Sequence, residues 1–183
     1  MPKLPQNFNT YVEPFFGGGA LYWEIQPPNA IINDINSTLI NYWTTVKNKP
    51  NSIKEFIQKT EDNEEYYYQL RDKFNNKELT LEEQAGAFYY FNRTGFNGLW
   101  RVNKNSEYNV SYDGINKRDL NFLISDIDTY SKQLKTTEIN NDDFRNILNN
   151  VKFDSNAFVF LDPPYLDCKT MYTESQDFMW IYN

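Results

Sequence analysis

The first 48 residues alternate between strand-like and helix-like segments, and this alternation constrains the fold more than any other feature of the sequence. Residues 10–13 and 30–33 are short, largely apolar segments typical of strands, and residues 20–25 and 37–47 have the composition of helices. A strand-helix-strand-helix order is typical of a parallel sheet covered by helices. We therefore predict an α/β fold whose core begins with these four elements.

A stretch dominated by helical patterns follows, from about residue 49 to residue 118. Thr80 and Glu83 stand in the spacing of a capping box, which marks the start of one helix, and Gly95 can end it. Residues 94–118 are rich in glycine, asparagine, arginine and tyrosine without a sustained period, which is typical of a long loop or a ribbon. The helices are predicted over residues 52–60, 64–75 and 81–92.

The last third of the chain returns to alternating helices and strands. Helices are predicted over residues 125–135 and 143–149, and strands over residues 137–139 and 157–161. The simplest arrangement is an α/β core of residues 1–48 and 119–183, interrupted by a mostly helical insertion of residues 49–118.

The absence of histidine limits the chemistry that this chain can perform. A Ser-His-Asp triad, a Cys-His pair and a histidine-ligated metal or zinc deaminase centre are all excluded, and we expect no bound metal. Because Cys168 is the single cysteine, no disulfide forms within one chain, which predicts a reducing compartment, the cytoplasm or the nucleus. No segment approaches the roughly 18 to 20 apolar residues of a membrane span, so we predict a soluble protein without a membrane partner.

Glycines stand between the first strand and the first helix, where backbone can approach a ligand closely. Gly17 and Gly19 match the start of the dinucleotide fingerprint, but the third glycine of that motif is missing. Asp34 follows the second strand, near the place where such folds direct a carboxylate at ribose hydroxyls. A tight turn at the glycines and a helix cap or turn at Asp34 are the alternatives.

The segment FVFLDPPY, residues 158–165, joins an apolar run to an acid, two prolines and an aromatic ring. Residues 158–161 are predicted to form a short buried strand that the prolines end, because proline has no N–H for a sheet. Asp162 and the backbone carbonyls offer acceptors, and Tyr165 offers a flat ring. This combination suits an amino group on an aromatic base, and an ordinary Asp-Pro turn is the alternative.

Residues 93–118 are basic although the whole chain carries a net charge of −7. An acidic protein binds nucleic acid only where basic side chains cluster. Here five basic and two acidic side chains give a local charge of +3. Arginine can read guanine edges or hold phosphate, and aromatic rings can enter a base stack. The segment is either a nucleic-acid interface or a solvated loop over an aromatic cluster. Its basic and aromatic residues include Arg93, Arg101, Lys104, Phe96, Trp100, Tyr108 and Tyr112.

Five motifs in order resemble the Dam-like adenine-N6 DNA methyltransferases over residues 11–166: EPFFGGGA, NDIN, EEYYYQLRDKF, NRTGFNGLWRVNKNSEYNV and FLDPPY. The resemblance implies a Rossmann-like methyltransferase sheet with a helical DNA-recognition insertion. It also implies S-adenosylmethionine as the cofactor, double-stranded DNA as the partner, and methyl transfer to N6 of an adenine that has left the duplex. Positioning and electrostatics would supply the catalysis without histidine.

The resemblance also assigns roles to individual residues. The catalytic set is Asp162, Pro163, Pro164 and Tyr165. The cofactor set is Glu13, Pro14, Phe15, Gly17, Gly19, Asp34, Asp143 and Phe144. The DNA-binding set is Arg93, Phe96, Asn97, Leu99, Arg101, Asn109 and Ser111, where Ser111 replaces a proline that is frequent in the family and leaves the target sequence open.

The chain also departs from the family pattern. The family has a lysine-rich Gly-Gly segment before the Glu-Pro-Phe motif and further strands after Asp-Pro-Pro-Tyr, and neither is recognisable here. We therefore expect an incomplete sheet, and either a fragment or a chain completed by a second chain or a second copy. An inactive relative that serves as a scaffold or DNA-binding subunit is the alternative function, RNA remains an alternative substrate, and a nicotinamide-dependent dehydrogenase is disfavoured by the incomplete fingerprint.

Overall fold

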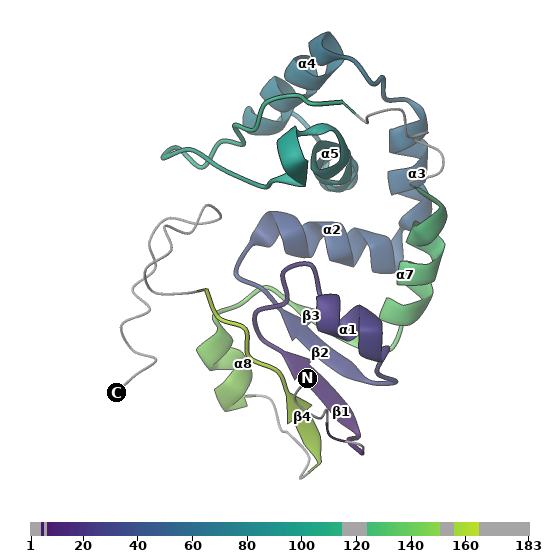
Figure 1. Cartoon of the computed structure of the whole chain (residues 1–183), viewed down its shortest axis with the longest axis vertical. Helices are drawn as coiled ribbons and strands as arrows, with labels where there is room; N and C mark the ends of the chain where they lie inside the picture. Colours follow the sequence, from purple (N-terminus) through teal and green to yellow (C-terminus); the bar gives the residue numbers. More distant parts are fainter. Residues whose placement is uncertain (1–4, 6, 115–123, 151–155, 165–183) are drawn as a thin grey trace.

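The computed structural model describes residues 5, 7–114, 124–150 and 156–164, and Figure 1 shows their arrangement. Within this part of the chain, four parallel strands form one sheet in the order β3-β2-β1-β4. The strands are β1 (Thr10–Glu13), β2 (Ala30–Asn33), β3 (Thr137–Asn140) and β4 (Ala157–Val159).

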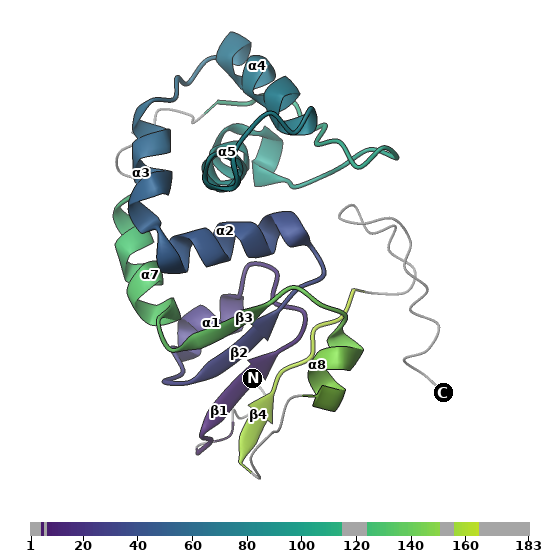
Figure 2. The same ribbon diagram turned by 180° about the vertical axis from the view of Figure 1, so that it is seen from behind.

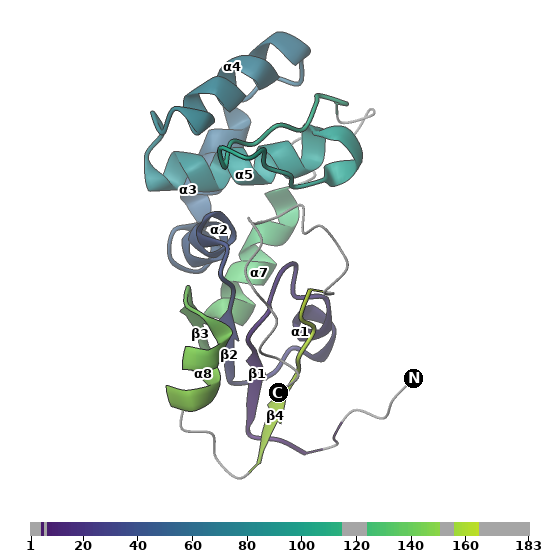
Figure 3. The same cartoon turned by 90° about the vertical axis from the view of Figure 1, so that its left-hand side faces the viewer.

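Helices surround the sheet and form a second layer above it. The α-helices are α1 (Ala20–Ile25), α2 (Ser37–Asn48), α3 (Pro50–Gln58), α4 (Glu64–Asn75), α5 (Leu81–Thr94), α7 (Ile127–Leu134) and α8 (Phe144–Asn150), and the 3-10 turns are η1 (Phe96–Gly98) and η2 (Ile124–Asp126). Helices α1 and α8 lie on opposite faces of the sheet (Figure 3). Helix α2 lies between the sheet and the layer of α3, α4 and α5, and Figure 2 shows the same order from behind.

The α/β class is confirmed, and the predicted helices and strands are present in this part of the chain with bounds that differ by at most two residues, although the end and the burial of the last strand differ from the prediction. The capping box at Thr80 and Glu83 is present, with both reciprocal bonds. Helix α3 begins two residues earlier than predicted, because Pro50 at the first position already has helical φ. No helix in the described ranges is long and apolar enough to cross a bilayer.

The prediction of a buried strand over residues 158–161 is wrong in two respects. Strand β4 ends at Val159, although the Phe160 N–H still donates to the Val12 carbonyl oxygen (2.8 Å). Its side chains are half-buried and Leu161 is 51% exposed. The physical reason is position, since among the described strands β4 pairs with β1 alone and lies at the edge of the sheet.

Aromatic rings fill the interior between the layers. Tyr42 of α2 contacts the Phe88 and Tyr89 rings of α5, with centroids 5.2 and 6.0 Å apart. Tyr67 of α4 is fully buried and packs on Phe91 of α5. The aromatic clusters of α4 and α5 are therefore helix faces in the core.

Parallel pairing brings the carboxyl ends of all four strands to one edge of the sheet. Val12 lies opposite Ile31 and Val159, and Asn33 lies opposite Asn140. The residues that follow the strands must consequently lie near one another, as is usual for ligand sites in open α/β sheets.

Candidate active site

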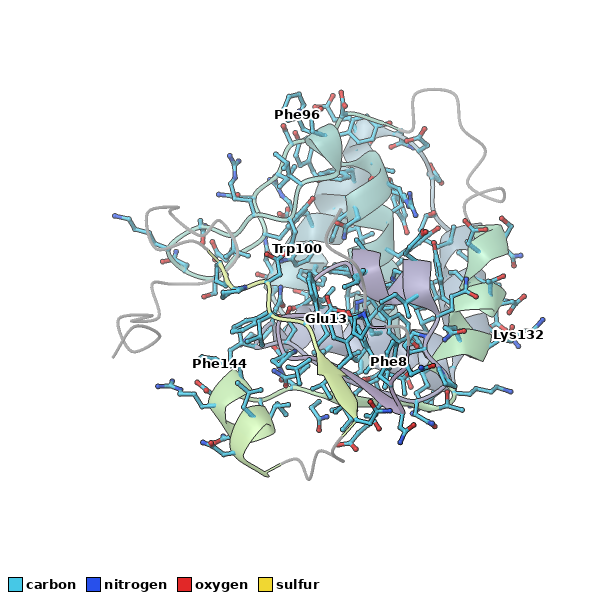
Figure 4. All side chains as sticks on the ribbon, turned by 60° about the horizontal axis from the view of Figure 1, so that its bottom comes forward. Phe8, Glu13, Phe96, Trp100, Lys132 and Phe144 are labelled. Atoms are coloured by element: carbon cyan, nitrogen blue, oxygen red, sulfur yellow. The ribbon has the colours of Figure 1, made fainter. Side chains whose placement is uncertain are left out.

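Three carboxylates from three strand ends gather at this edge of the sheet. Glu13 ends β1, Asp34 follows β2, and Asp162 follows β4. Glu13 is 3% exposed, and burial raises its pKa to about 7, against the effect of a hydrogen bond from the Tyr11 hydroxyl (2.8 Å). The negative charges of Asp162 and Asp34 raise this pKa further. Figure 4 shows Glu13 in the interior, beside the segment that leaves β4.

Asp34 is hydrogen-bonded to the glycine loop, which we define as Gly17, Gly18 and Gly19. Its Oδ2 accepts the Gly17 N–H (2.9 Å), and its Oδ1 accepts the Asn36 N–H (2.9 Å). Burial raises the pKa of Asp34, although both backbone hydrogen bonds act in the opposite direction. The helix cap of α2 is formed by Asn36, whose Oδ1 accepts two backbone N–H groups at the start of the helix. Asp34 therefore forms a turn, does not cap the helix, and connects the first two strand ends.

The glycine loop has a backbone that other residues cannot adopt easily. Gly17 and Gly19 have φ angles of 49° and 66°, and a Cβ on Gly19 would lie 2.3 Å from the Phe16 ring. Two indole N–H groups hold the loop by its carbonyl oxygens, from Trp43 to Gly17 (3.2 Å) and from Trp23 to Gly18 (2.9 Å). Sequence reasoning missed these two tryptophans, because their partners are set by the fold of α1 and α2.

Asn33 joins three strand ends through its buried side chain. Its Nδ2 donates to the Pro14 carbonyl oxygen (3.0 Å) and to the Asp142 carbonyl oxygen (2.9 Å), and its Oδ1 accepts the Asp142 N–H (2.9 Å). Asn141 adds bonds from its Nδ2 to the Asp34 and Ile35 carbonyl oxygens. Sequence reasoning missed Asn33, and the one available signal was an amide at the end of a buried strand.

Replacing Asn33 with leucine should destabilise the fold by about 2 to 4 kcal/mol, because two carbonyl oxygens and one N–H lose their partner in a buried site. Urea unfolding followed by circular dichroism measures the effect. Asn149→Leu, at an exposed position of α8, is the matched control. An equal loss of unfolding free energy in both variants would contradict the role given to Asn33.

The start of α8 packs against the loop after β1. The Phe15 and Phe144 rings lie 4.9 Å apart between centroids, and Arg145 lies 5.5 Å from the Phe144 centroid. Asp143 accepts two bonds from the Arg145 guanidinium, which lowers the pKa of Asp143. The members of the predicted cofactor set thus lie in one region, from the last residue of β1 through the loops after β1, β2 and β3 to the first residue of α8.

The predicted catalytic segment is described as far as Pro164. Asp162 is exposed, and Pro163 and Pro164 are half-buried. The pairing of β4 with β1 and the bond from the Phe160 N–H to the Val12 carbonyl oxygen bring this segment to the same edge as the cofactor set. Tyr165 lies outside the described residues.

The predicted DNA-binding residues lie apart from this edge, on α5, η1 and the ribbon, which we define as residues 99–112. An antiparallel bridge between Val102 and Tyr108 joins the two arms of the ribbon. The ribbon projects on the side of the molecule where the chain leaves β4 (Figures 1 and 2). Phe96 is 49% exposed and donates its N–H to the Ser111 carbonyl oxygen (2.9 Å). In Figure 4 Phe96 lies at the outer end of the helical layer.

The remaining members of the DNA-binding set have defined surroundings too. Arg93 lies on α5, 5.1 Å from the centroid of the Tyr89 ring. Asn97 has a left-handed φ of 53°, a conformation that asparagine tolerates better than most residues. Leu99 is half-buried against the core, and Arg101 bonds to Asn109 across the ribbon. The structure therefore presents Arg93, Asn97 and Arg101 outward and anchors Leu99.

Polar groups on one face of α4 hold the backbone of the ribbon. Asn75 bonds to both backbone groups of Tyr108, accepting its N–H at 2.9 Å and donating to its carbonyl oxygen at 3.0 Å. The Tyr67 hydroxyl (3.0 Å) and Arg71 Nη1 (3.2 Å) both donate to the Val110 carbonyl oxygen. Residues spaced four apart share one helix face. Sequence reasoning missed this function of Tyr67, Arg71 and Asn75, although their spacing was visible.

Comparison with known proteins gives a family and several relatives. The family model for D12 class N6 adenine-specific DNA methyltransferases matches residues 1–178. A type II methyltransferase of Lactococcus lactis subsp. cremoris is 34% identical over 170 residues, which cover 89% of this chain and 59% of that protein. A type II methyltransferase of Methanocaldococcus jannaschii is 36% identical over 174 residues, covering 87% and 59%.

A DNA adenine methylase of Salmonella typhi is 30% identical over 158 residues, covering 84% of this chain and 55% of that protein. The chain spans about three fifths of the length of these curated relatives. The match of the family model, residues 1–178, covers the sheet, the helical layer and the ribbon, and it includes every strand end described above. This chain belongs to the family of D12 class N6 adenine-specific DNA methyltransferases.

Proposed function

We propose that this chain transfers a methyl group from S-adenosylmethionine to N6 of an adenine in double-stranded DNA. The observation that carries the proposal is the gathering of Glu13, Asp34 and Asp162 at one edge of a parallel sheet. Membership of the D12 family supports the reaction, and the relative from Salmonella typhi is by name a DNA adenine methylase.

The residues at the edge fit the proposed cofactor. S-adenosylmethionine carries positive charge on its sulfonium and its amino group, and a buried carboxylate such as Glu13 complements such charges. Asp34 is the proposed acceptor for the ribose hydroxyls of the cofactor. The paired rings of Phe15 and Phe144 offer an apolar wall for a purine. When bound, the cofactor supplies an activated methyl group. Pro14, Gly17, Gly19 and Asp143 complete the proposed set.

Asp162 and the Pro163 carbonyl oxygen are the proposed acceptors for the two N6 hydrogens of the extruded adenine, and Tyr165 is the proposed stacking ring. These bonds draw the hydrogens aside and aim the nitrogen lone pair at the methyl group. The new C–N6 bond would form as the methyl–sulfur bond of the cofactor breaks, which would leave neutral S-adenosylhomocysteine. N6 would release one proton, which Asp162 would pass to solvent because its side chain is exposed. Pro164 fixes the backbone between the acceptors and the ring.

The ribbon and the end of α5 form the proposed DNA interface. The ribbon projects on the side of the molecule where the chain leaves β4 (Figures 1 and 2), and it carries basic and aromatic residues. In this proposal residues 49–118 form the recognition insertion, and residues 1–48 and 119–183 form the catalytic core. Arg93, Phe96, Asn97, Leu99, Arg101, Asn109 and Ser111 are the proposed contact or support residues.

A second chain or a second copy that extends the sheet is a further part of the proposal. Within the described strands, β3 and β4 each pair on one side, and such edges are ready templates for another strand. Sedimentation equilibrium at micromolar concentration tests it, and a stable monodisperse monomer would contradict it. The reducing compartment predicted from Cys168 stands with this proposal, as does a cytoplasmic or nuclear location.

The proposed reaction is tested with the full chain, S-adenosylmethionine and DNA that lacks methylated adenine. After digestion to nucleosides, mass spectrometry should find N6-methyladenine that increases with time. Calorimetry with the cofactor alone is run in parallel. A folded chain that binds cofactor and DNA yet makes no product would favour the inactive scaffold over the enzyme.

A further inference from the structure

Arg101 and Asn109 face each other across the ribbon and are joined by three hydrogen bonds. The Asn109 N–H donates to the Arg101 carbonyl oxygen (3.1 Å), Arg101 Nε donates to Asn109 Oδ1 (2.8 Å), and Arg101 Nη2 donates to the Asn109 carbonyl oxygen (3.2 Å). One edge of the guanidinium is therefore occupied by Asn109. The Nη1 group and the second N–H of Nη2 lie outside these bonds and form a planar fork of donors at the end of the side chain.

The ribbon carries this pair on a fixed backbone. Side chains alternate along each arm, so Trp100 and Tyr108 point into the core while their neighbours Arg101 and Asn109 point away from it. The Trp100 and Tyr108 rings stack with centroids 4.6 Å apart, and Asn75 holds both backbone groups of Tyr108. On this supported backbone, the bonds from Arg101 Nε and Nη2 to Asn109 set the plane of the guanidinium.

We propose that Asn109 is a positioning residue that holds Arg101 as an end-on fork for one guanine of the target site, and that Asn109 reads no base itself. The inference rests on the proposed function, because it takes duplex DNA as the ligand. Guanine O6 and N7 lie side by side in one plane and accept two donors from such a fork. A phosphate accepts donors from many directions, so a fixed plane is more useful on a base edge.

A binding selection on random duplexes tests the inference, with the full chain and S-adenosylhomocysteine so that methyl transfer is not needed. Arg101→Ala should lower the preference for guanine at one position by about 10- to 100-fold. Asn109→Ala should weaken the preference at that same position by about 3- to 10-fold. The double variant should be no worse than Arg101→Ala, because the two residues act through one contact.

Asn109→Asp keeps an acceptor for Arg101 Nε, so it should keep the guanine preference, although its added charge lowers affinity for all duplexes. Asn149→Ala, at an exposed position of α8 outside the proposed DNA interface, is the matched control and should leave every preference unchanged. Unfolding midpoints equal to that of the wild type show that the variants fold.

Three results would overturn the inference. The first is a changed preference at a different position in Asn109→Ala, which would mean that Asn109 reads a base. The second is a uniform loss across all duplexes in Arg101→Ala with a salt slope lower by about one, which would mean that Arg101 holds a phosphate. The third is the absence of a base preference in the wild type. Because the selection reads binding, each result is separable from a failure of methyl transfer.

Discussion

Asp162→Ala should reduce the rate of methyl transfer by about 100- to 1,000-fold, the usual loss when one group that stabilises developing charge is removed. The variant should bind S-adenosylmethionine with an affinity within about threefold of the wild type, because Asp162 is assigned to the adenine and lies outside the cofactor set. Single-turnover kinetics with saturating cofactor and DNA measure the rate. Asp128→Ala, which removes an exposed aspartate that pairs with Lys54, is the control and should keep full activity.

Asp162→Ala should also change the pH dependence of cofactor affinity. The charge of Asp162 contributes to the raised pKa of Glu13, so its removal should lower that pKa and move the pH dependence of cofactor affinity to lower pH. Calorimetry over a pH series detects the shift. An unchanged pH dependence would contradict the electrostatic effect of Asp162 on Glu13, and activity within about threefold of the wild type would contradict the catalytic role of Asp162.

Glu13→Gln should make the fold more stable above neutral pH and the cofactor affinity lower. In the folded chain the pKa of Glu13 is raised from 4.5 to about 7, mainly by burial. A raised pKa means that the stability contributed by the protonated group is complete below pH 4.5 and is lost as pH rises through about 7. Glutamine keeps an acceptor for the Tyr11 hydroxyl and has no charge to bury, so the gain at about pH 8 should approach 3 kcal/mol.

The cofactor affinity should change in the opposite direction. A cationic cofactor prefers ionised Glu13, so wild-type affinity should rise from about pH 6 to about pH 8, by roughly tenfold. In Glu13→Gln the affinity should be lower at the upper end and nearly independent of pH. Urea unfolding and calorimetry on both proteins measure the two effects. A variant that is no more stable at about pH 8, or an affinity in the wild type that falls with pH, would contradict the role of Glu13.

The candidate site could be predicted from the sequence where local signals mark it. Glu13, Asp34 and Asp162 each follow a short apolar segment, and parallel pairing then brings strand ends together regardless of the residues between them. The roles of Gly17 and Gly19 could also be predicted, because a strand-to-helix turn with φ above zero needs glycine. Helix bounds were close because caps such as Thr80 and Glu83 are local.

The missed features depend on partners that lie far along the chain. Asn33 bonds to Asp142 across 109 positions, and Asn75 bonds to Tyr108 across 33 positions. The burial of Phe158 was misjudged because an apolar run does not reveal whether its strand lies at the centre or the edge of a sheet. The bond from Arg101 to Asn109 depends on the register of the ribbon, which residues 94–118 do not show as a period.

The most direct measurement follows a labelled methyl group. The full chain is incubated with S-adenosylmethionine that carries a trideuteromethyl group and with duplex DNA, and the nucleosides are analysed by mass spectrometry beside Asp162→Ala. We expect the label on N6 of adenine with the wild type and almost none with the variant. Label on cytosine, label on adenine at equal rates in both proteins, or a folded chain that transfers no label would contradict the proposal that this sheet edge is an adenine-N6 methyltransferase site.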